Sequence, residues 1–169
     1  MLKLLVPVDG SRNSHYAVRY AIKAFTENTA MEVHLLNVQP MFSQYIARFV
    51  SKRDRDAFHR DEAEKVLRPI GRMLDHAGVP HTMHIEVGNK ARLIVEAARR
   101  LRCDRIVMST ARKNSLIRMV EDSVIIQVLE LTSVPVEVIA GDAASKAERY
   151  GIPAGVGAFL ASLFFAAAN

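Results

Sequence analysis

The sequence predicts an α/β protein with a five-stranded parallel sheet and helices on both faces. Five short apolar runs are bounded by turn residues, a pattern typical of strands that are buried on both faces. Stretches with helical periodicity separate these runs, so that strands and helices alternate along the chain. Right-handed crossovers then leave few ways to arrange the strands.

The first strand is expected over residues 2–8, an apolar run that contains one lysine and ends in the turn residues 9–11. Ser11 or Ser14 can cap the helix that follows. Its buried face is marked at helical spacing by Ala17, Val18, Ala21, Ile22 and Phe25. The second strand is expected over residues 31–38, closed by Gln39 and a proline.

Residues 41–77 form the second helical region. Its first part, to residue 50, is apolar but irregular, which leaves open a loop that folds over the sheet. Residues 53–75 are rich in charge, and a buried helical stripe is marked by Ala63, Val66, Leu67, Ile70 and Leu74. Pro69 falls inside this stretch and is expected to kink or split the helix, whereas Gly78 is a natural helix stop.

The remainder of the domain alternates again, with strands expected at residues 81–87, 105–108 and 134–139 and helices at residues 91–101 and 124–131. We expect the domain to span residues 1–141. Residues 142–169 then form a C-terminal apolar tail, because the composition changes there and residues 151–168 carry no charge.

Composition excludes several classes of protein. The net charge is +5, but the basic residues are spread over the expected helices, and no motif of a nucleic-acid-binding fold is present, so we expect no nucleic acid partner. The single cysteine, Cys103, fits a reducing compartment and is expected to be a small buried residue. Residues 1–9 lead directly into a strand and turn, with no signal peptide pattern, which favours the cytoplasm.

Residues for catalysis or metal binding do not form a recognisable pattern. His81 and His84 are three apart in an expected strand, so they point to opposite faces, and no histidine pair has helical metal-ligand spacing. The serines lack an evident His–Asp partnership or a nucleophile elbow. We therefore expect neither a metal site nor an enzyme.

Three groups of residues resemble the universal stress protein family, over about residues 1–140. The first group matches the family's first strand and turn. The second group matches the family's third strand and the opening of the next helix, and the third group matches its final strands. These matches are residues 6–11 with Ser14 and Ala17, residues 78–80 and 87–91 with Ile94, and residues 104–108, 123–124 and 134–136.

This resemblance implies a flavodoxin-like sheet of the adenine nucleotide alpha hydrolase kind, with strand order 3-2-1-4-5. It also implies a homodimer formed through the last strand, with Val134, Val136 and Val138 on the dimer-forming edge. A dimer mate would cover the otherwise exposed edge of the sheet.

The ATP-binding branch of the family carries a spaced glycine motif between the fourth strand and the fourth helix. In this sequence its three glycine positions fall on Ser109, Arg112 and Asp122, and only the terminal Ser123 is retained. Asp9 matches a position that approaches the nucleotide in ATP-binding relatives. Val38 matches a position that lines the adenine. Both residues can also be explained structurally, because Asp9 ends a strand and can bond turn N–H groups, and Val38 is the last apolar residue of its strand.

The altered loop is expected to disfavour ATP. Glycines in a phosphate loop let backbone N–H groups approach the oxygens, whereas Arg112 places a long side chain there. Glu121 and Asp122 stand at the start of the fourth helix, where each would oppose a phosphate by about 1 kcal/mol or more. We expect no cofactor. The alternative is an ATP-binding switch or weak ATPase that uses Arg112 and Lys113 as phosphate ligands.

The sequence thus predicts a non-catalytic, dimeric stress-response protein with an unidentified protein partner.

The C-terminal tail leaves several alternatives open. Residues 151–168 are at the lower limit for spanning a bilayer and follow Lys146 and Arg149, which suits a membrane-associated regulator. Leu160, Leu163 and Phe164 fall on one apolar helical stripe, which Phe159 and Phe165 widen. Such a stripe suits a helix that packs on the domain or its dimer mate, or one that lies on a membrane surface, and disorder is the remaining alternative.

Overall fold

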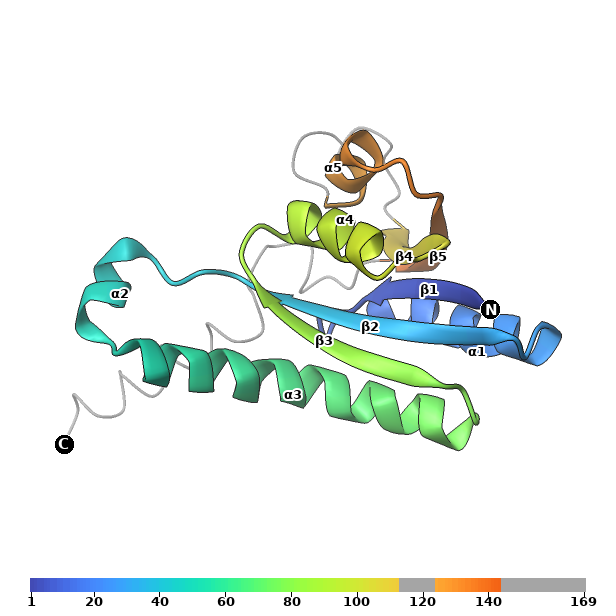
Figure 1. The fold of residues 1–169 in the computed structure, drawn as a ribbon, viewed down its shortest axis with the longest axis horizontal. Helices are drawn as coiled ribbons and strands as arrows, with labels where there is room; N and C mark the ends of the chain where they lie inside the picture. The colour runs from blue at the N-terminus through green and yellow to red at the C-terminus, as the bar shows by residue number, and fades with distance from the viewer. Residues whose placement is uncertain (113–123, 144–169) are drawn as a thin grey trace.

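The computed structural model describes residues 1–112 and 124–143, and these form a five-stranded parallel sheet covered by helices on both faces (Figure 1). The strand order is β3-β2-β1-β4-β5, which confirms the predicted fold class and strand order. The strands are β1 (Leu2–Pro7), β2 (Met31–Gln39), β3 (His81–Val87), β4 (Arg105–Arg112) and β5 (Val136–Ala143). The helices are α1 (Ser14–Glu27), α2 (Gln44–Phe49), α3 (Lys52–His76), α4 (Lys90–Arg100) and α5 (Val124–Leu131).

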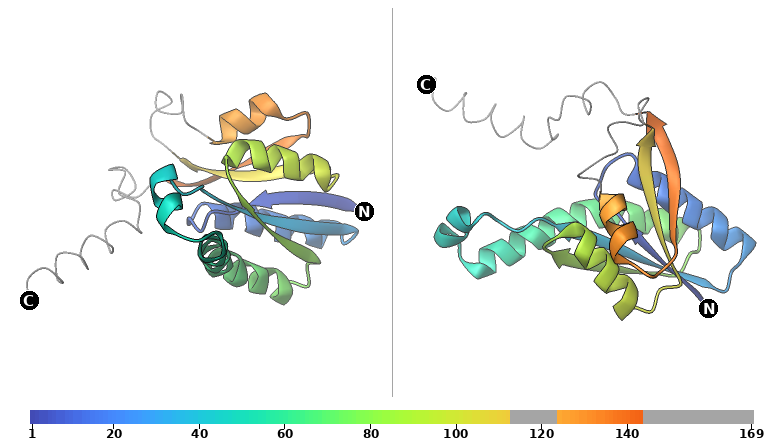
Figure 2. Two further views of the ribbon diagram at one scale, coloured as in Figure 1. Left: turned by 60° about the vertical axis from the view of Figure 1, so that its left-hand side comes forward. Right: turned by 90° about the horizontal axis from the view of Figure 1, so that it is seen from above.

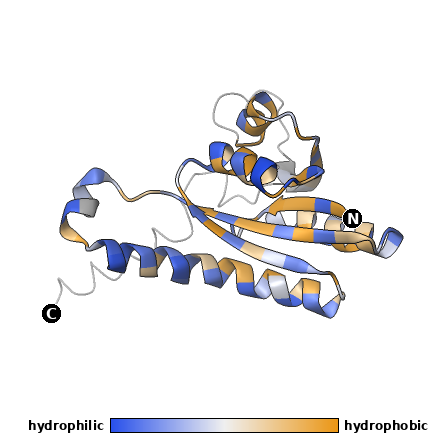
Figure 3. Ribbon diagram, in the orientation of Figure 1, coloured by the Kyte–Doolittle hydropathy of each residue, from blue (hydrophilic) through white to orange (hydrophobic). Residues whose placement is uncertain are grey.

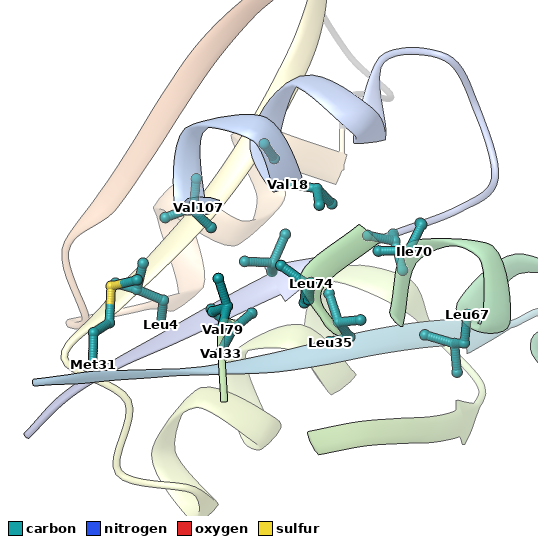
Figure 4. Packing of buried hydrophobic residues seen from close by; sticks show 14 of the residues in the cluster. Leu4, Val18, Met31, Val33, Leu35, Leu67, Ile70, Leu74, Val79 and Val107 are labelled. Carbon is teal, nitrogen blue, oxygen red and sulfur yellow. The ribbon is translucent and has the colours of Figure 1, made fainter. Parts of the chain in front are cut away.

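Two hydrophobic layers hold the helices on the sheet, one on each face (Figure 2). Helices α1 and α3 cover one face, where side chains such as Val18, Leu67 and Leu74 pack on strand residues that include Val33 and Leu35 (Figure 4). Helices α4 and α5 cover the other face. Strands β1 and β2 are mostly hydrophobic because both of their faces are buried (Figure 3).

The second helical region differs from its prediction in two ways. Residues 44–49 form the short helix α2, which lies beyond the ends of the strands instead of folding over the sheet (Figure 1). Helix α3 is a single helix of 25 residues and is not split at Pro69. Pro69 is exposed, so its ring points away from the stripe that packs on the sheet, and that packing holds the helix together.

A chain of polar side chains crosses the sheet beneath α4. The imidazoles of His34 and His84 face each other, with 3.1 Å between Nδ1 and Nε2. The other nitrogen of His34 lies 3.3 Å from a Glu32 oxygen, and that carboxylate pairs with Lys3 at 2.9 Å. Burial, then the neighbouring charges of His34 and Arg100, lower the pKa of His84, although Glu86 opposes this. The hydrogen bond between the two rings requires one unprotonated nitrogen.

The free energy of unfolding is expected to fall as the pH drops below about 6.5, the ordinary pKa of a histidine. The pKa of His84 is lower in the folded state, so the unfolded chain binds the proton first, and the stability present above this pH is lost on acidification. In His84→Gln this loss should be smaller. Urea unfolding at several values between pH 5 and pH 7.5 measures it.

Thr82→Gln provides the control, because Thr82 is exposed on the same strand and carries no ionisable group, so the slope of stability against pH should stay as it is in the unmodified chain. The Lys3 hydrogen bond lowers the pKa of Glu32. The contribution of Glu32 to the free energy of unfolding is therefore lost only below the ordinary pKa of 4.5, which is outside the measured pH range. Equal slopes for His84→Gln and the unmodified chain would contradict the assignment.

Candidate functional site

A pocket of about 350 Å³ opens at the carboxyl ends of the central strands. The chain continues from β1 to β2 on one side, whereas the neighbour of β1 on the other side is β4, so the strand order reverses at this point. Ligands bind at such switch points in open α/β sheets, and we call this cavity the switch-point pocket. Strand ends supply Pro7, Val8, Leu36, Val38, Met108, Ser109 and Thr110. The segment after β1 and the starts of the helices supply Asp9, Ser11, Asn13, Ser14, Lys90, Ile94, Val124 and Ile125.

The loop between β1 and α1 forms one wall of the pocket. Gly10 has a φ of +79°, a left-handed conformation that favours glycine, and it lets the chain turn immediately after the strand. A carboxylate oxygen of Asp9 accepts a hydrogen bond from the Ser11 amide at 3.0 Å, and the Ser14 hydroxyl donates to the Ser11 carbonyl at 2.8 Å. Local hydrogen bonds therefore fix the position of Asp9 at the pocket.

Asn37 anchors the end of β1 from the neighbouring strand. Its side-chain amide donates to the Val8 carbonyl at 2.7 Å, and its oxygen accepts from the Gln39 side chain at 2.6 Å. Asn37 is buried, so these bonds satisfy a polar group that water does not reach. The residue thus sets the spacing between the ends of β1 and β2 at the pocket.

The opposite wall is the end of β4, which is longer than the sequence predicted. The strand was expected to end at residue 108, but it continues to Arg112 and pairs with β5 as far as Ala143. A register shift lies between Thr110 and Arg112. The Ser109 hydroxyl donates to the Asn13 carbonyl and so ties this wall to the loop after β1.

The structure brings together three of the six predicted site residues. Asp9, Val38 and Ser109 all line the switch-point pocket, although their sequence positions are far apart. Arg112 is the last residue of β4, and its side chain lies outside the described part of the structure. Asp122 and Ser123, as well as Lys113 of the alternative phosphate site, also lie outside the described residues.

Sequence reasoning missed Lys90 and Asn13 as pocket residues. A signal for Lys90 was available, because Asn89 is a good helix cap directly after a strand, which places the next residue at the carboxyl edge of the sheet. In the structure the Asn89 side chain accepts from the Arg92 amide at 3.0 Å. Asn13 carries no comparable signal, since its contribution depends on the contact with β4.

The pocket suits a small ligand with an apolar part and a polar part. Helices α1, α4 and α5 all begin at its rim, and helix N-termini attract negative charge. Among the described lining residues, Lys90 carries the positive charge and Asp9 the negative one.

The thiol of Cys103 lies away from the pocket, at the other edge of the sheet, just before β4. Burial raises the pKa of this thiol to about 11, so it is protonated at neutral pH.

Residues 1–112 and 124–143 contain neither an arranged set of metal ligands nor a membrane-spanning helix. No group of three or more histidine, cysteine or acidic side chains within this range is arranged to hold a metal ion. No helix in the same range has the length and apolar character needed to cross a membrane.

Comparisons with known proteins point to one family. The universal stress protein family profile matches residues 1–140. Universal stress protein MJ0531 of Methanocaldococcus jannaschii is 30% identical to this chain over 140 residues, which cover 81% of each protein.

Solved structures show the same similarity. Hypothetical protein MJ0577 superposes with a TM-score of 0.68 at 26% identity, covering 85% of this chain and 98% of that one. A universal stress protein family protein from Arabidopsis thaliana, solved with AMP bound, has a TM-score of 0.60 at 16% identity. That superposition covers 92% of this chain and 97% of the Arabidopsis protein.

Proposed function

The chain belongs to the universal stress protein family, and we propose that it is a non-catalytic, dimeric stress-response regulator whose switch-point pocket does not bind ATP. One observation carries the proposal. Strand β4 continues through Ser109 and Arg112, the positions of the first two motif glycines, and pairs there with β5. Backbone that is engaged in a strand ladder is not available to wrap around a triphosphate.

The side chain at the first of these positions supports the same conclusion. Glycine would leave room for a phosphate oxygen close to the backbone, whereas Ser109 fills this place and donates its hydroxyl to Asn13. This intramolecular hydrogen bond occupies the place on β4 where a glycine of the phosphate loop would leave the backbone bare. The regulator then acts through partner contacts and not through nucleotide hydrolysis.

A specific observation favours a second function, nucleotide binding. Asp9 and Val38, the two positions that match nucleotide contacts in relatives, do line a pocket of about 350 Å³, a volume within the usual range of ligand sites. The Arabidopsis relative was solved with AMP. Under this second candidate the chain is an ATP-binding switch or weak ATPase, with Arg112 and Lys113 as phosphate ligands and Lys90 adding positive charge at the rim.

Calorimetric titration of the purified protein with magnesium ATP distinguishes the two functions. We expect no saturable binding of ATP and no nucleotide mass on the native protein in non-denaturing mass spectrometry. AMP is titrated in parallel, because a pocket that lacks a triphosphate loop can still accept a shorter ligand. Micromolar ATP affinity that is lost in Arg112→Ala would overturn the proposal and establish the second candidate.

The dimer is proposed to form through β5. This strand is at one edge of the sheet, and in the described residues its outer side has no neighbouring strand. Val138 is 42% exposed there, while Val134 and Val136 pack against the layer beneath α4 and α5. Val134 precedes the strand, which begins at Val136. An exposed valine on a free edge supports strand-to-strand pairing with a second copy.

Val138→Lys is expected to convert the dimer to a monomer, because it places a desolvated charge and a like-charge pair at a two-fold interface. Light scattering coupled to size exclusion measures the mass. Leu129→Lys is the matched control, since Leu129 is about as exposed (51%) but lies on α5. A Val138→Lys protein that keeps the dimer mass would place the interface elsewhere.

A further inference from the structure

A cluster of apolar side chains is exposed on the segment that projects past the sheet. We call residues 41–59 the arm; it contains α2 and the first turns of α3 and lies beyond the carboxyl ends of the strands (Figures 1 and 2). Met41, Tyr45, Phe49 and Phe58 are between 49% and 75% exposed. Exposed apolar side chains that gather on one segment are typical of a surface that binds a partner.

The arm side chains are ordered against one another. The ring of Phe42 lies 5.3 Å from that of Phe58 and 4.7 Å from that of His59, and Tyr45 contacts Phe49 at 5.3 Å. His59 is buried, and its Nδ1 has no hydrogen-bond partner in the part of the chain that the structure describes. The exposed aromatic rings are therefore already held in place, because Phe42 packs on Phe58 and His59 while Tyr45 packs on Phe49.

The same chain contains an apolar segment beyond the described residues. Residues 151–168 carry no charge, and Phe159, Leu160, Leu163 and Phe164 fall on one stripe at helical spacing. Ser162, which lies within the stripe region, is the one hydroxyl in this segment. An uncharged apolar segment matches an aromatic surface, because neither side then buries an unpaired charge.

The segment leaves the domain at a suitable point. Strand β5 ends at Ala143, and β2 ends at Gln39, directly before the arm; in a parallel sheet both ends lie at the same edge. These two strands are three strand spacings apart, roughly 14 Å. Residues 144–150 span up to about 23 Å when extended, so residue 151 can reach the base of the arm.

We infer that residues 151–168 dock on the exposed aromatic surface of the arm in the same chain. Because the two are joined by a short linker, the contact forms at the high effective concentration of an intramolecular partner. The apolar stripe then covers Tyr45, Phe49 and Phe58. The tail is thus an integral part of the fold rather than an appendage that seeks a separate target.

Photo-crosslinking of the full chain tests this inference. The photoreactive amino acid p-benzoylphenylalanine replaces Tyr45, and peptides are mapped by mass spectrometry after irradiation. We expect crosslinks to residues 151–168 within one chain, as shown by mixing isotope-labelled and unlabelled protein. The same probe in place of Leu131 is the control, because α5 ends at the opposite edge of the sheet and should give no tail crosslink.

A substitution in the tail makes the test sharper without touching the folded domain. Phe164→Asp should lower the Tyr45 crosslink yield by about tenfold or more, because a carboxylate would have to be desolvated in the contact. Asn169→Asp adds the same charge outside the stripe and should leave the yield unchanged. Crosslinks between labelled and unlabelled copies, or none to the tail, would overturn the inference. The inference would also be overturned if the chain sedimented with phosphatidylserine vesicles and the crosslink to the tail were lost in that fraction.

Discussion

Leu35→Ala is expected to lower the free energy of unfolding by about 2 to 5 kcal/mol, the cost of removing a large side chain from a packed core. Leu35 is fully buried at the centre of β2, between β1 and β3, and packs in the layer beneath α1 and α3 (Figure 4). The cavity left behind cannot collapse easily, because strands fix it on both sides. Urea unfolding followed by far-ultraviolet circular dichroism measures the loss.

The matched control is Leu131→Ala, which removes the same atoms from a side chain that is half exposed at the end of α5. Its effect should be a small fraction of that at Leu35, since little apolar area returns to water. Both proteins are compared at one concentration, because dimer formation would also stabilise the folded state. Equal losses at the two sites would contradict the packing described for β2.

Asn37→Leu is expected to cost about 1 to 3 kcal/mol, although leucine is similar in size and more hydrophobic. The substitution removes the donor for the Val8 carbonyl and leaves this buried acceptor without its partner. The Gln39 side chain loses its acceptor as well. Thermal unfolding monitored by calorimetry, at fixed protein concentration, reports the change.

Asn28→Leu serves as the control, because the Asn28 side chain also bonds a backbone group, the Ala30 amide at 3.0 Å, but in an exposed turn. Water can replace this partner, so the expected loss is smaller than at Asn37. A smaller effect at Asn37 than at Asn28 would mean that the end of β1 does not depend on the bridge from β2.

The sequence was sufficient to predict most strands and helices because their signals are local, whereas the strand order came from the family resemblance. Runs such as residues 81–87 and 124–131 have the composition and periodicity of one element, and the structure contains them with the same bounds. The extension of β4 from residue 108 to 112 had no such signal. Ser109 to Arg112 become strand through pairing with β5, and that contact is set by the tertiary structure.

The candidate site was predicted only in part for the same reason. Asp9, Val38 and Ser109 could be placed at strand ends, and parallel strands bring such ends together. Asn13 could not be found in this way, because its position depends on a hydrogen bond from Ser109. The projection of α2 away from the sheet was likewise not encoded in periodicity, since residues 41–50 are apolar but irregular and left open a loop that folds over the sheet.

The packing of Asn13 links the switch-point pocket to β5. Its side-chain oxygen lies so close to Gly141 of β5 that a Cβ there would come within 2.5 Å of it, and the Thr110 carbonyl closes the other side at 3.0 Å. A ligand that displaces Asn13 would therefore change its packing against β5. If the chain dimerises through β5 as proposed, ligand occupancy and subunit assembly are thermodynamically coupled, each changing the affinity of the other by the same factor.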